Sequence, residues 1–449
     1  MIRIASLIVG LGLTLTSIAG AAPNIVFILV DDMGYGDLSS YGAPDAKTPH
    51  IDQLAAEGVR LTQCYSNGAE CTPSRTAILT GRYPQRVGGL ECAIGTGNVG
   101  RYDHAINLAE KSDLGLPADY AVLVPGLKKA GYATAVFGKW HLGYEPKFNP
   151  LEQGFDEFRG FLGGNVDYFH HVELSDLPVI LDGREFVERK GYMTHVITND
   201  AIEFINEQSK DKDSPFFLYV PYSTPHFPFQ GPRDAGQELW PAEQWTVGER
   251  DKYVEMLEDM DDEVGRLMAA LAAAGVDDNT LVVYASDHGA MKPGVNTPFR
   301  DYKGTLFEGG IRVPCIARWP GKLKEGLVSN QVTTLMDLTP SFLRAAGAEI
   351  PDDLDGMDII EHIQENRADE TRNLFWRARR GDRTWVAARM GEHKYVKKTE
   401  GGEAEEWFFD LKEDHREEKS LLDSGGESLA NAKSALANWE KAVTPERGQ

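Results

Sequence analysis

Four continuous apolar runs, rich in β-branched and aromatic residues, constrain the fold more than any other feature of the sequence. They span residues 23–30, 133–137, 215–220 and 280–285. Runs of this length without polar alternation are typical of parallel strands that are buried on both faces. Each run leads into residues that can carry chemistry: Asp31 and Asp32, Lys139 and His141, His226, and Asp287 and His288. Because the carboxyl ends of parallel strands meet at one edge of a sheet, the sequence predicts a site at that edge.

The segments around these runs predict an α/β fold with a second, smaller sheet. Apolar residues recur at helical spacing over residues 249–275, and we expect the acidic cluster at 258–263 to be a solvated face and not a metal site. After residue 371, short aromatic runs alternate with glycine-containing turns, as in an antiparallel sheet. We therefore expect a large mixed, mainly parallel sheet sandwiched by helices, with a small C-terminal antiparallel-sheet subdomain.

The 449 residues exceed one average domain, and the composition shifts suggest where the chain divides. We expect a signal peptide at 1–21, a catalytic domain at 22–347, a linker at 348–370 and a C-terminal subdomain at 371–449. That subdomain would hold a four-stranded antiparallel sheet and a closing helix. Residues 90–119 lack a regular pattern and predict a long functional loop.

The N-terminus has the pattern of a secretory signal. Arg3 precedes an apolar run at residues 4–19, and Ala19-Gly20-Ala21 offers a cleavage site. This predicts a periplasmic or secreted protein with no membrane span after cleavage, and an uncleaved membrane anchor is the alternative. The net charge of −23 argues against a nucleic acid partner, because a protein that tracks phosphates needs a basic surface. It does not exclude an anionic substrate in a locally basic pocket.

Cys71 opens a Cys-Thr-Pro-Ser-Arg stretch that is followed by an apolar helical run. This order places the thiol at a helix N-terminus, where backbone N–H groups and the helix dipole favour an anion. Arg75 and Arg82 flank the turn and favour a functional cysteine, whereas a buried structural thiol is the alternative. Three other cysteines would remain if Cys71 were converted, and this odd number argues against a disulfide framework.

Carboxylates at the predicted edge indicate a metal site. Asp31, Asp32, Asp287 and His288, brought together with the Cys71 turn, would form a cage suited to a hard divalent cation such as Ca²⁺. Imidazole suits softer metals, so zinc is the alternative for this cage. Zinc sites usually contain more histidine or cysteine than this cage offers.

The stretch at residues 71–82 resembles the signature of the type I, formylglycine-dependent sulfatases of the alkaline phosphatase superfamily. Further segments resemble the family in its own order along nearly the whole mature chain: residues 24–36, 138–143, 224–226, 286–289, 303–312 and 408–417. The resemblance implies an alkaline-phosphatase-like fold and an enzyme that hydrolyses a sulfate ester. It also implies that a separate maturation enzyme oxidises Cys71 to formylglycine (3-oxoalanine).

The same resemblance implies a role for each site residue. Ca²⁺ would be held by Asp31, Asp32, Cys71 in its modified form, Asp287 and His288, a position where the family more often has Asn. Arg75, Lys139 and His141 would surround the nucleophile, and Lys139 and Lys303 would neutralise the sulfate oxygens. Hydrated formylglycine would attack sulfur and form a sulfo-enzyme intermediate. His226 would protonate the leaving alcohol, and His141 would help to regenerate the aldehyde.

The only indication of the substrate in the sequence is the predicted export. An exported enzyme is expected to act on an extracellular sulfated polysaccharide or oligosaccharide. Some family members act on marine algal galactans such as carrageenan. Loop-like stretches offer residues that could line a sugar pocket: Tyr102, Asp103, His104, Asp167, His170, His171, Trp240, Arg300, Arg379 and Arg380. Two alternatives stay open: a phosphodiesterase or phosphonate hydrolase of the same superfamily, and a non-catalytic glycan-binding protein whose Cys71 is never modified.

Overall fold

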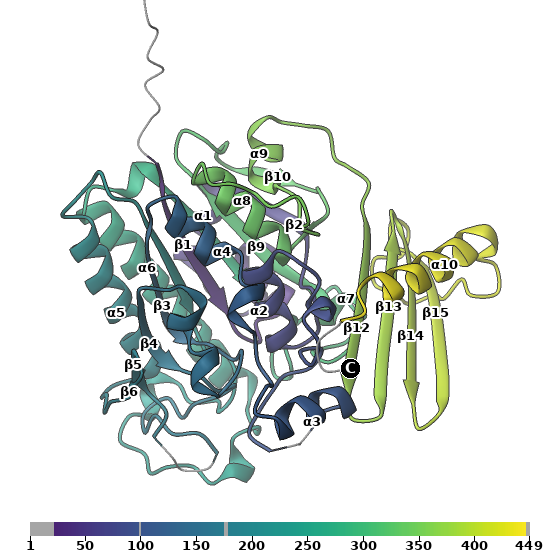
Figure 1. Cartoon of the computed structure of the whole chain (residues 1–449), viewed down its shortest axis with the longest axis horizontal. Coiled ribbons are helices and arrows are strands. Elements are labelled where there is room, and N and C mark those ends of the chain that lie inside the picture. The colour runs from purple at the N-terminus through teal and green to yellow at the C-terminus, as the bar shows by residue number, and fades with distance from the viewer. Residues whose placement is uncertain (1–21, 98–99, 175–177, 446–449) are drawn as a thin grey trace, which may run out of the picture.

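The computed structural model describes residues 22–97, 100–174 and 178–445, and it is built around one large sheet (Figure 1). The strands of this sheet lie in the order β10-β2-β9-β8-β1-β7-β3-β4-β5-β6, with β11 beside β2. They are β1 Asn24–Val30, β2 Val59–Tyr65, β3 Ala133–Lys139, β4 Glu157–Phe161, β5 Leu181–Asp182, β6 Glu185–Phe186, β7 Phe216–Pro221, β8 Thr280–Ser286, β9 Arg312–Arg318, β10 Leu327–Ser329 and β11 Thr333–Thr334.

The four apolar runs form four neighbouring strands at the centre of this sheet, as predicted. Strands β8, β1, β7 and β3 are adjacent and mutually parallel. Ile25 of β1 lies opposite Phe217 on one side and Leu281 on the other. Strands β9, β5 and β6 pair antiparallel with their neighbours, so the sheet is mixed but mainly parallel. The carboxyl ends of the four central strands meet at one edge.

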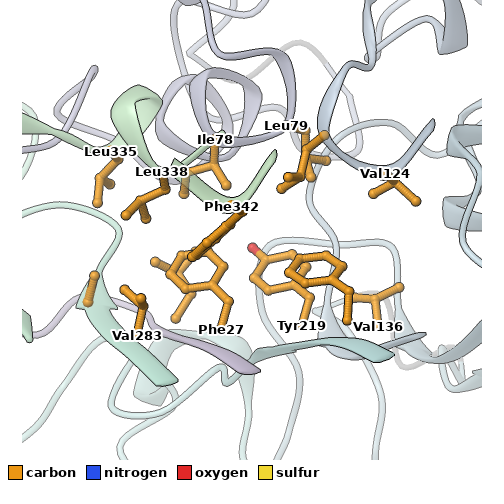
Figure 2. Packing of buried hydrophobic residues seen from close by; sticks show 14 of the residues in the cluster. Phe27, Ile78, Leu79, Val124, Val136, Tyr219, Val283, Leu335, Leu338 and Phe342 are labelled. Carbon is orange, nitrogen blue, oxygen red and sulfur yellow. The ribbon is translucent and has the colours of Figure 1, made fainter. Parts of the chain in front are cut away.

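Helices cover both faces of the sheet because alternate residues of the buried strands point to opposite sides. Phe27 of β1 packs on one side with residues of α2, α4, α8 and α9, and Val26 packs on the other with residues of α1, α5 and α6. Figure 2 shows Phe342 of α8 against Phe27, which stacks with Tyr219 of β7. The helices are α1 Pro49–Ala56, α2 Cys71–Thr80, α3 Asp103–Glu110, α4 Leu123–Lys129, α5 Met193–Gln208, α6 Arg250–Ala273, α7 Glu308–Ile311, α8 Leu338–Ala345, α9 Ile359–Gln364 and α10 Gly426–Ala442.

The C-terminal part forms the expected four-stranded antiparallel sheet, and α10 packs against it (Figure 1). Its strands are β12 Asn373–Arg380, β13 Arg383–Met390, β14 His393–Glu400 and β15 Glu403–Asp410. The two residues between successive strands include Gly381, Gly391 and Gly401, each at positive φ. Such short hairpin turns require that backbone conformation, which glycine adopts at no steric cost.

A buried ionic cluster joins the segment that contains α7 to the second sheet. Lys394 Nζ of β14 lies 2.8 Å from Glu308 Oε1 and 2.9 Å from Glu417 Oε1, and all three side chains are fully buried. Glu417 also accepts the backbone N–H of Glu308 at 2.6 Å. An apolar cluster that includes Phe307 and Trp385 surrounds this contact. The second sheet is therefore firmly attached near the predicted site.

Three stretches have more regular or more buried structure than their sequence patterns indicate. The stretch at 90–119 contains helix α3, because Ala105 and Leu108 bury one face of it. The stretch at 348–370 contains α9, which packs on α8. The acidic cluster of α6 is not wholly solvated: Asp261 is buried and accepts the backbone N–H groups of His50 and Ile51 at 3.0 and 2.8 Å. It thus satisfies N–H groups at the start of α1, which a helix leaves without an internal partner.

All four cysteines are buried and none forms a disulfide, as expected. The predicted signal peptide lies outside the described residues. Among the residues that are described, no helix has the length and apolar character needed to cross a membrane.

Candidate active site

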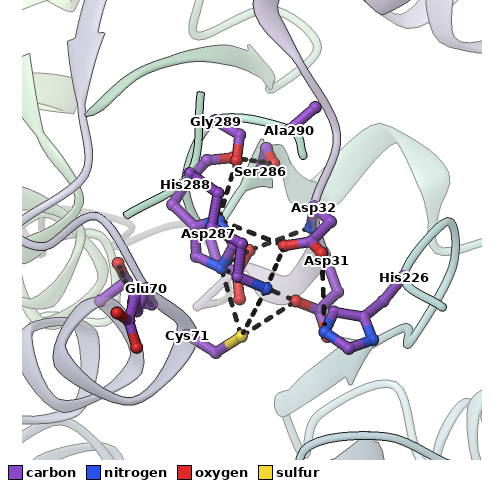
Figure 3. Close-up of polar contacts among 12 residues, drawn as sticks. Asp31, Asp32, Glu70, Cys71, His226, Ser286, Asp287, His288, Gly289 and Ala290 are labelled. Carbon is purple, nitrogen blue, oxygen red and sulfur yellow. Dashed lines mark hydrogen bonds and ion pairs between the residues drawn. The ribbon is translucent and has the colours of Figure 1, made fainter. Parts of the chain in front are cut away.

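The structure brings the predicted site residues together at the carboxyl edge of the central strands (Figure 3). Asp31 and Asp32 follow β1, and Asp287 and His288 follow β8. Backbone hydrogen bonds hold these strand ends side by side: Asp287 N donates to Val30 O at 3.0 Å, and Asp31 N donates to Thr224 O at 3.2 Å. The sheet therefore sets the relative positions of these four residues.

The Cys71 thiol lies at the centre of this group. Its Sγ is 3.3 Å from Asp31 Oδ1, 3.2 Å from His288 Nε2 and 3.3 Å from Lys139 Nζ. Lys303 Nζ is slightly farther away, at 3.9 Å. Burial, and next the nearby Asp31 carboxylate, raise the pKa of Cys71 well above its ordinary value. As an unmodified residue it is a protonated thiol at neutral pH, in spite of the adjacent lysines.

Helix α2 holds Cys71 at its first position, as the sequence predicts. Ser74 Oγ donates to the carbonyls of Gly68 and Glu70 at 3.1 and 3.0 Å, which fixes the turn that leads into the helix. Gly68 must be small there, because a Cβ would lie 2.6 Å from the ring of Pro73. The whole helix is buried, so the position of residue 71 is rigidly set.

Arg75, one turn along α2, connects three strand ends. Its guanidinium is almost fully buried. It donates one hydrogen bond from Nη1 to Lys139 O at 2.9 Å and another from Nη2 to Asp287 Oδ2 at 3.1 Å. Asp31 Oδ2 lies 3.8 Å from the same Nη2. Arg75 therefore positions the carboxylates and the Lys139 backbone relative to residue 71.

Three buried carboxylates face three cationic side chains. Lys139 is hydrogen-bonded to Asp31, and Lys303 Nζ lies 2.6 Å from Asp32 Oδ1. Burial alone would raise the pKa of Asp31, but the attraction of Lys139, His226, Arg75 and Lys303 together outweighs burial and holds the pKa well below its ordinary value. Burial and the Asp31 charge raise the pKa of Asp287. The site thus concentrates carboxylate charge that its own cations only just match.

The donor set fits a divalent cation. Asp31, Cys71, Asp287 and His288 each offer one ligand atom within 4.8 Å of the others, and so do Asp31, Asp32, Cys71 and His226. Asp32 Oδ2 is buried without a hydrogen-bond partner, which is a costly state for a carboxylate oxygen and one that a cation would relieve. Three carboxylates, Asp31, Asp32 and Asp287, contribute to these two sets, and carboxylate oxygens are the ligands that Ca²⁺ prefers.

Two histidines border the same space with opposite tautomers. His141 Nε2 is 2.6 Å from Ile94 O and so donates to it, which leaves Nδ1 without a partner. His226 Nδ1 is 2.8 Å from Phe227 O, and its Nε2 is 3.5 Å from Asp32 Oδ2. Burial lowers the pKa of His141 well below its ordinary value and that of His226 to about 3, so both rings are neutral at pH 7.

A cavity of about 620 Å³ opens onto these groups. Among its lining residues are Cys71, His141, His226 and Lys303. Gly164 also lines it, and a Cβ at that position would lie 2.6 Å from the His141 ring. The volume falls within the range of about 300–1,000 Å³ that is usual for small-molecule sites. The cavity can therefore hold several groups of a substrate beyond a single sulfate.

The residues that the sequence suggested for a sugar pocket mostly lie elsewhere. None of Tyr102, Asp103, His104, Asp167, His170, His171 and Arg300 is among the residues that line this cavity. Tyr102 is buried under Arg379, and Arg300 donates to Glu417 O at 2.9 Å and stacks 3.9 Å from the Phe307 ring centroid. These arginine and tyrosine side chains are used in packing.

The histidine pair of that set is also structural. Asp167 is fully buried and accepts N–H groups of Phe169 and His170 and the side-chain amide of Gln230. His171 donates from Nε2 to Gly191 O at 3.0 Å. Trp240 lines a separate depression. These polar residues thus stabilise the conformation of their own loop by hydrogen bonds. The sequence pattern of such residues does not show whether they hold the loop or bind a substrate.

Other cavity residues were missed. Arg380 was among the suggested residues and does line the cavity, but Glu70, Tyr144, Glu173 and Arg383 were not suggested. Burial raises the pKa of Glu173 to about 7, with a hydrogen bond from Tyr144 opposing the shift. These residues come from four separate segments of the chain, so no local pattern marks them. The turn at Gly381 was the one available signal for Arg380 and Arg383.

Comparison with known proteins gives consistent matches. A family model described as "Sulfatase" matches residues 23–348, and one described as "N-sulphoglucosamine sulphohydrolase, C-terminal" matches residues 299–438. The chain is 35% identical to N-acetylgalactosamine-6-sulfatase of Homo sapiens over 393 residues, which cover 83% of this chain and 71% of that protein. It is 31% identical to arylsulfatase A of Bos taurus over 484 residues, or 95% and 90% of the two chains. The crystal structure of Ps i-CgsB in complex with k-i-k-neocarrahexaose matches with a TM-score of 0.81 at 28% identity, over 93% of each chain.

Proposed function

The chain belongs to the sulfatase family and hydrolyses sulfate esters, and we propose that it is an exported enzyme that acts on a sulfated carbohydrate. In this proposal the nucleophile is a formylglycine that a separate maturation enzyme forms from Cys71. The position of Cys71 at the start of α2 and at the floor of the cavity supports this role.

The observation that carries the proposal is the pair of lysines at the thiol. Lys139 Nζ and Lys303 Nζ lie 3.3 and 3.9 Å from Cys71 Sγ. A sulfate ester spreads negative charge over its oxygens, so catalysis of its transfer depends mainly on positioning and cationic stabilisation. Two ammonium groups next to residue 71 supply that stabilisation. Arg75 donates a hydrogen bond to the Lys139 carbonyl and so holds the backbone that carries this lysine.

We assign a Ca²⁺ ion to Asp31, Asp32, Asp287 and His288, next to residue 71. The ion would supply positive charge for the sulfate oxygens, and the aldehyde hydrate derived from Cys71 would supply the attacking oxygen. In the present structure Lys139 and Lys303 neutralise Asp31 and Asp32. A bound Ca²⁺ ion would neutralise Asp31 and Asp32 in place of the lysines. The two ammonium groups would then be available to bind the sulfate oxygens of the substrate.

The two histidines would manage the protons. His141 keeps its proton on Nε2 through Ile94 O, so its unpartnered Nδ1 can accept a proton from the group at residue 71. His226 keeps one proton on Nδ1 through Phe227 O, and burial keeps Nε2 free of a second proton in the structure as it stands. The Asp32 carboxylate 3.5 Å from Nε2 opposes this effect of burial, and the negative charge of a bound sulfate ester would add to it, so that Nε2 would take up a proton when substrate binds. We infer that this second proton goes to the leaving alcohol oxygen.

The assignment of His226 is tested by the leaving group. A sugar sulfate has a poor leaving group that needs a proton, whereas nitrophenyl sulfate has a good one that does not. His226→Ala should therefore lose far more activity on a sugar sulfate than on nitrophenyl sulfate. Equal losses on the two substrates would refute the role of His226 as the acid.

The carbohydrate substrate is proposed from two similarities. One relative is an N-acetylgalactosamine-6-sulfatase, and one similar structure holds k-i-k-neocarrahexaose. Sulfated galactans such as carrageenan and N-acetylgalactosamine 6-sulfate are accordingly the first substrates to assay. The signal-like N-terminus supports export to the periplasm or the medium, where such polymers are met. Mass determination of the mature N-terminus tests the export.

The proposed function is tested by parallel assays on sulfate and phosphate esters. Protein co-expressed with a formylglycine-generating enzyme should release inorganic sulfate from sulfated oligosaccharides, and should act far more slowly on the matched phosphate diesters. Faster hydrolysis of the diesters would favour a phosphodiesterase of the same superfamily. Binding of the oligosaccharides without release, by protein with an intact Cys71 thiol, would favour a glycan-binding protein.

A further inference from the structure

Two arginines face the cavity from the first hairpin of the C-terminal sheet. Arg380 ends β12 and Arg383 begins β13, and the two residues are directly opposite each other in the strand pairing. Both line the cavity that opens onto Cys71. The active site is therefore bordered by a part of the chain that supplies none of the residues around the thiol.

The two guanidiniums differ in how their charge is matched. Arg380 Nη1 lies 3.0 Å from Glu70 Oε2, and the same carboxylate oxygen accepts the N–H of Ala93 at 2.7 Å. Arg383 has no ion pair with any residue that the structure describes, and its buried Nε has no hydrogen-bond partner. Glu400, on nearby β14, is instead paired with Lys398 at 2.7 Å.

This arrangement is costly for the protein alone. Like charges directly opposite each other on neighbouring strands repel, and a buried polar nitrogen without a partner loses the hydrogen bond that it had in water. The chain has a net charge of −23, so carboxylates are abundant in the sequence. The one whose pKa Arg383 helps to lower, Glu400, is exposed, and the first cause of that lowering is its hydrogen bond with Lys398. An anion in the cavity would relieve both costs, and a guanidinium fork matches the oxygens of a sulfate or a carboxylate.

We propose that Arg383, assisted by Arg380, binds a second anionic group of the substrate, distinct from the sulfate ester that reacts at residue 71. The inference rests on the proposed function and narrows its substrate class to saccharides with two anionic groups. The second group is either another sulfate or a uronic acid carboxylate. The reacting sulfate already has Lys139 and Lys303 at the thiol, and neither arginine contacts Cys71.

The test compares three matched oligosaccharides: one with a single sulfate, one with a second sulfate and one with a uronic acid beside the single sulfate. The measured quantity is the ratio of kcat/KM for a doubly anionic substrate to that for the singly sulfated one. We expect Arg383→Gln to reduce this ratio by about 10- to 100-fold, mainly through KM, as for loss of a charged hydrogen bond. Arg383→Lys should give an intermediate ratio, because it keeps the charge and loses the fork.

Arg379→Gln is the matched control. Arg379 is the neighbour of Arg380 on β12, contacts the Tyr102 ring and does not line the cavity, so its substitution should leave the ratio at the parent value. The parent's preference between the two doubly anionic substrates identifies the second group as sulfate or carboxylate. Equal turnover of all three substrates by the parent, or an unchanged ratio in Arg383→Gln, would overturn the inference.

Calorimetric binding separates this inference from the proposed function. The Cys71→Ala chain cannot form the nucleophile, so its affinities for the three oligosaccharides report recognition alone. Tighter binding of a doubly anionic oligosaccharide that disappears in Cys71→Ala/Arg383→Gln supports the inference even if the parent releases no sulfate. Sulfate release with no dependence of affinity on Arg383 would leave the sulfatase standing and refute the second anion site.

Discussion

Substitution of Lys394 by Met should destabilise the protein strongly, because Lys394 is the central cation of the buried ionic cluster. Its Nζ contacts Glu308 and Glu417 at 2.8 and 2.9 Å, and the three side chains are fully buried. Met fills a similar volume but leaves two buried carboxyl groups without their shared partner. Breaking a buried pair in this way typically costs about 3–5 kcal/mol of unfolding free energy.

The two carboxyl groups should respond differently. Burial opposes ionisation of Glu308, but the attraction of Lys394, Arg312 and Arg389 together outweighs burial and lowers the pKa to about 2. Glu308 would keep Arg312 at 3.2 Å and the Tyr65 hydroxyl at 2.6 Å after the substitution. Burial raises the pKa of Glu417 to about 7, so this group carries most of the penalty. We expect Lys394→Met/Glu417→Gln to recover at least about 1 kcal/mol of the loss.

The assay is urea denaturation followed by tryptophan fluorescence at pH 7.5. Lys147→Met is the matched control. Lys147 Nζ lies 2.8 Å from Asp113 Oδ1, but the two side chains are 53% and 37% exposed, and such solvent-accessible pairs contribute at most about 1 kcal/mol. A loss below about 1 kcal/mol for Lys394→Met, or no recovery in the double variant, would refute the reasoning.

Three further predictions follow from single groups. Lys303→Ala should lower kcat on nitrophenyl sulfate by about 100-fold or more, because it removes a cation at residue 71; a change below tenfold would contradict the role. Asp261→Ala should cost about 1–3 kcal/mol in urea denaturation, because two N–H groups of α1 lose their acceptor, and should leave kcat unchanged. The pKa of Glu417 is about 7 in the folded protein, above its ordinary 4.5. The contribution of Glu417 to the unfolding free energy is therefore complete below pH 4.5. It is lost as the pH rises to 7, because the carboxyl group ionises first in the unfolded chain. The unfolding free energy of Glu417→Gln should therefore fall less between pH 5 and pH 7 than that of the parent; equal slopes would exclude this linkage.

The central strands could be predicted because their sequences are unambiguous. Residues 25–30 are apolar without interruption, and a short run of this kind is typical of a strand that is buried on both faces, as β1 is. The polar residues that follow were therefore correctly expected to meet at one edge, and Asp31, Cys71, Lys139 and His288 do lie in contact there. Strands β2 and β9 were not predicted. Strand β2 is only partly buried and has polar residues at its half-exposed positions, and β9 is almost wholly buried but its sequence has an arginine at each end and Pro314 within it.

The cavity walls could not be predicted, because they depend on how distant segments pack. Tyr102 and Arg300 look like pocket residues in the sequence, yet both are used in packing near the second sheet. Arg383 looks like an ordinary hairpin residue, and the attachment of that sheet, through Lys394 and through ion pairs such as Arg380 with Glu70, brings the hairpin to the cavity. Long-range packing of this kind leaves no local periodicity in the sequence.

The central claim is that residue 71, after conversion, is the nucleophile of a sulfatase. The most direct measurement is the release of inorganic sulfate from a sulfated oligosaccharide by protein whose conversion at residue 71 has been verified by peptide mass spectrometry. The account predicts release by the converted parent and none by Cys71→Ala. Release by Cys71→Ala at the parent rate would contradict it.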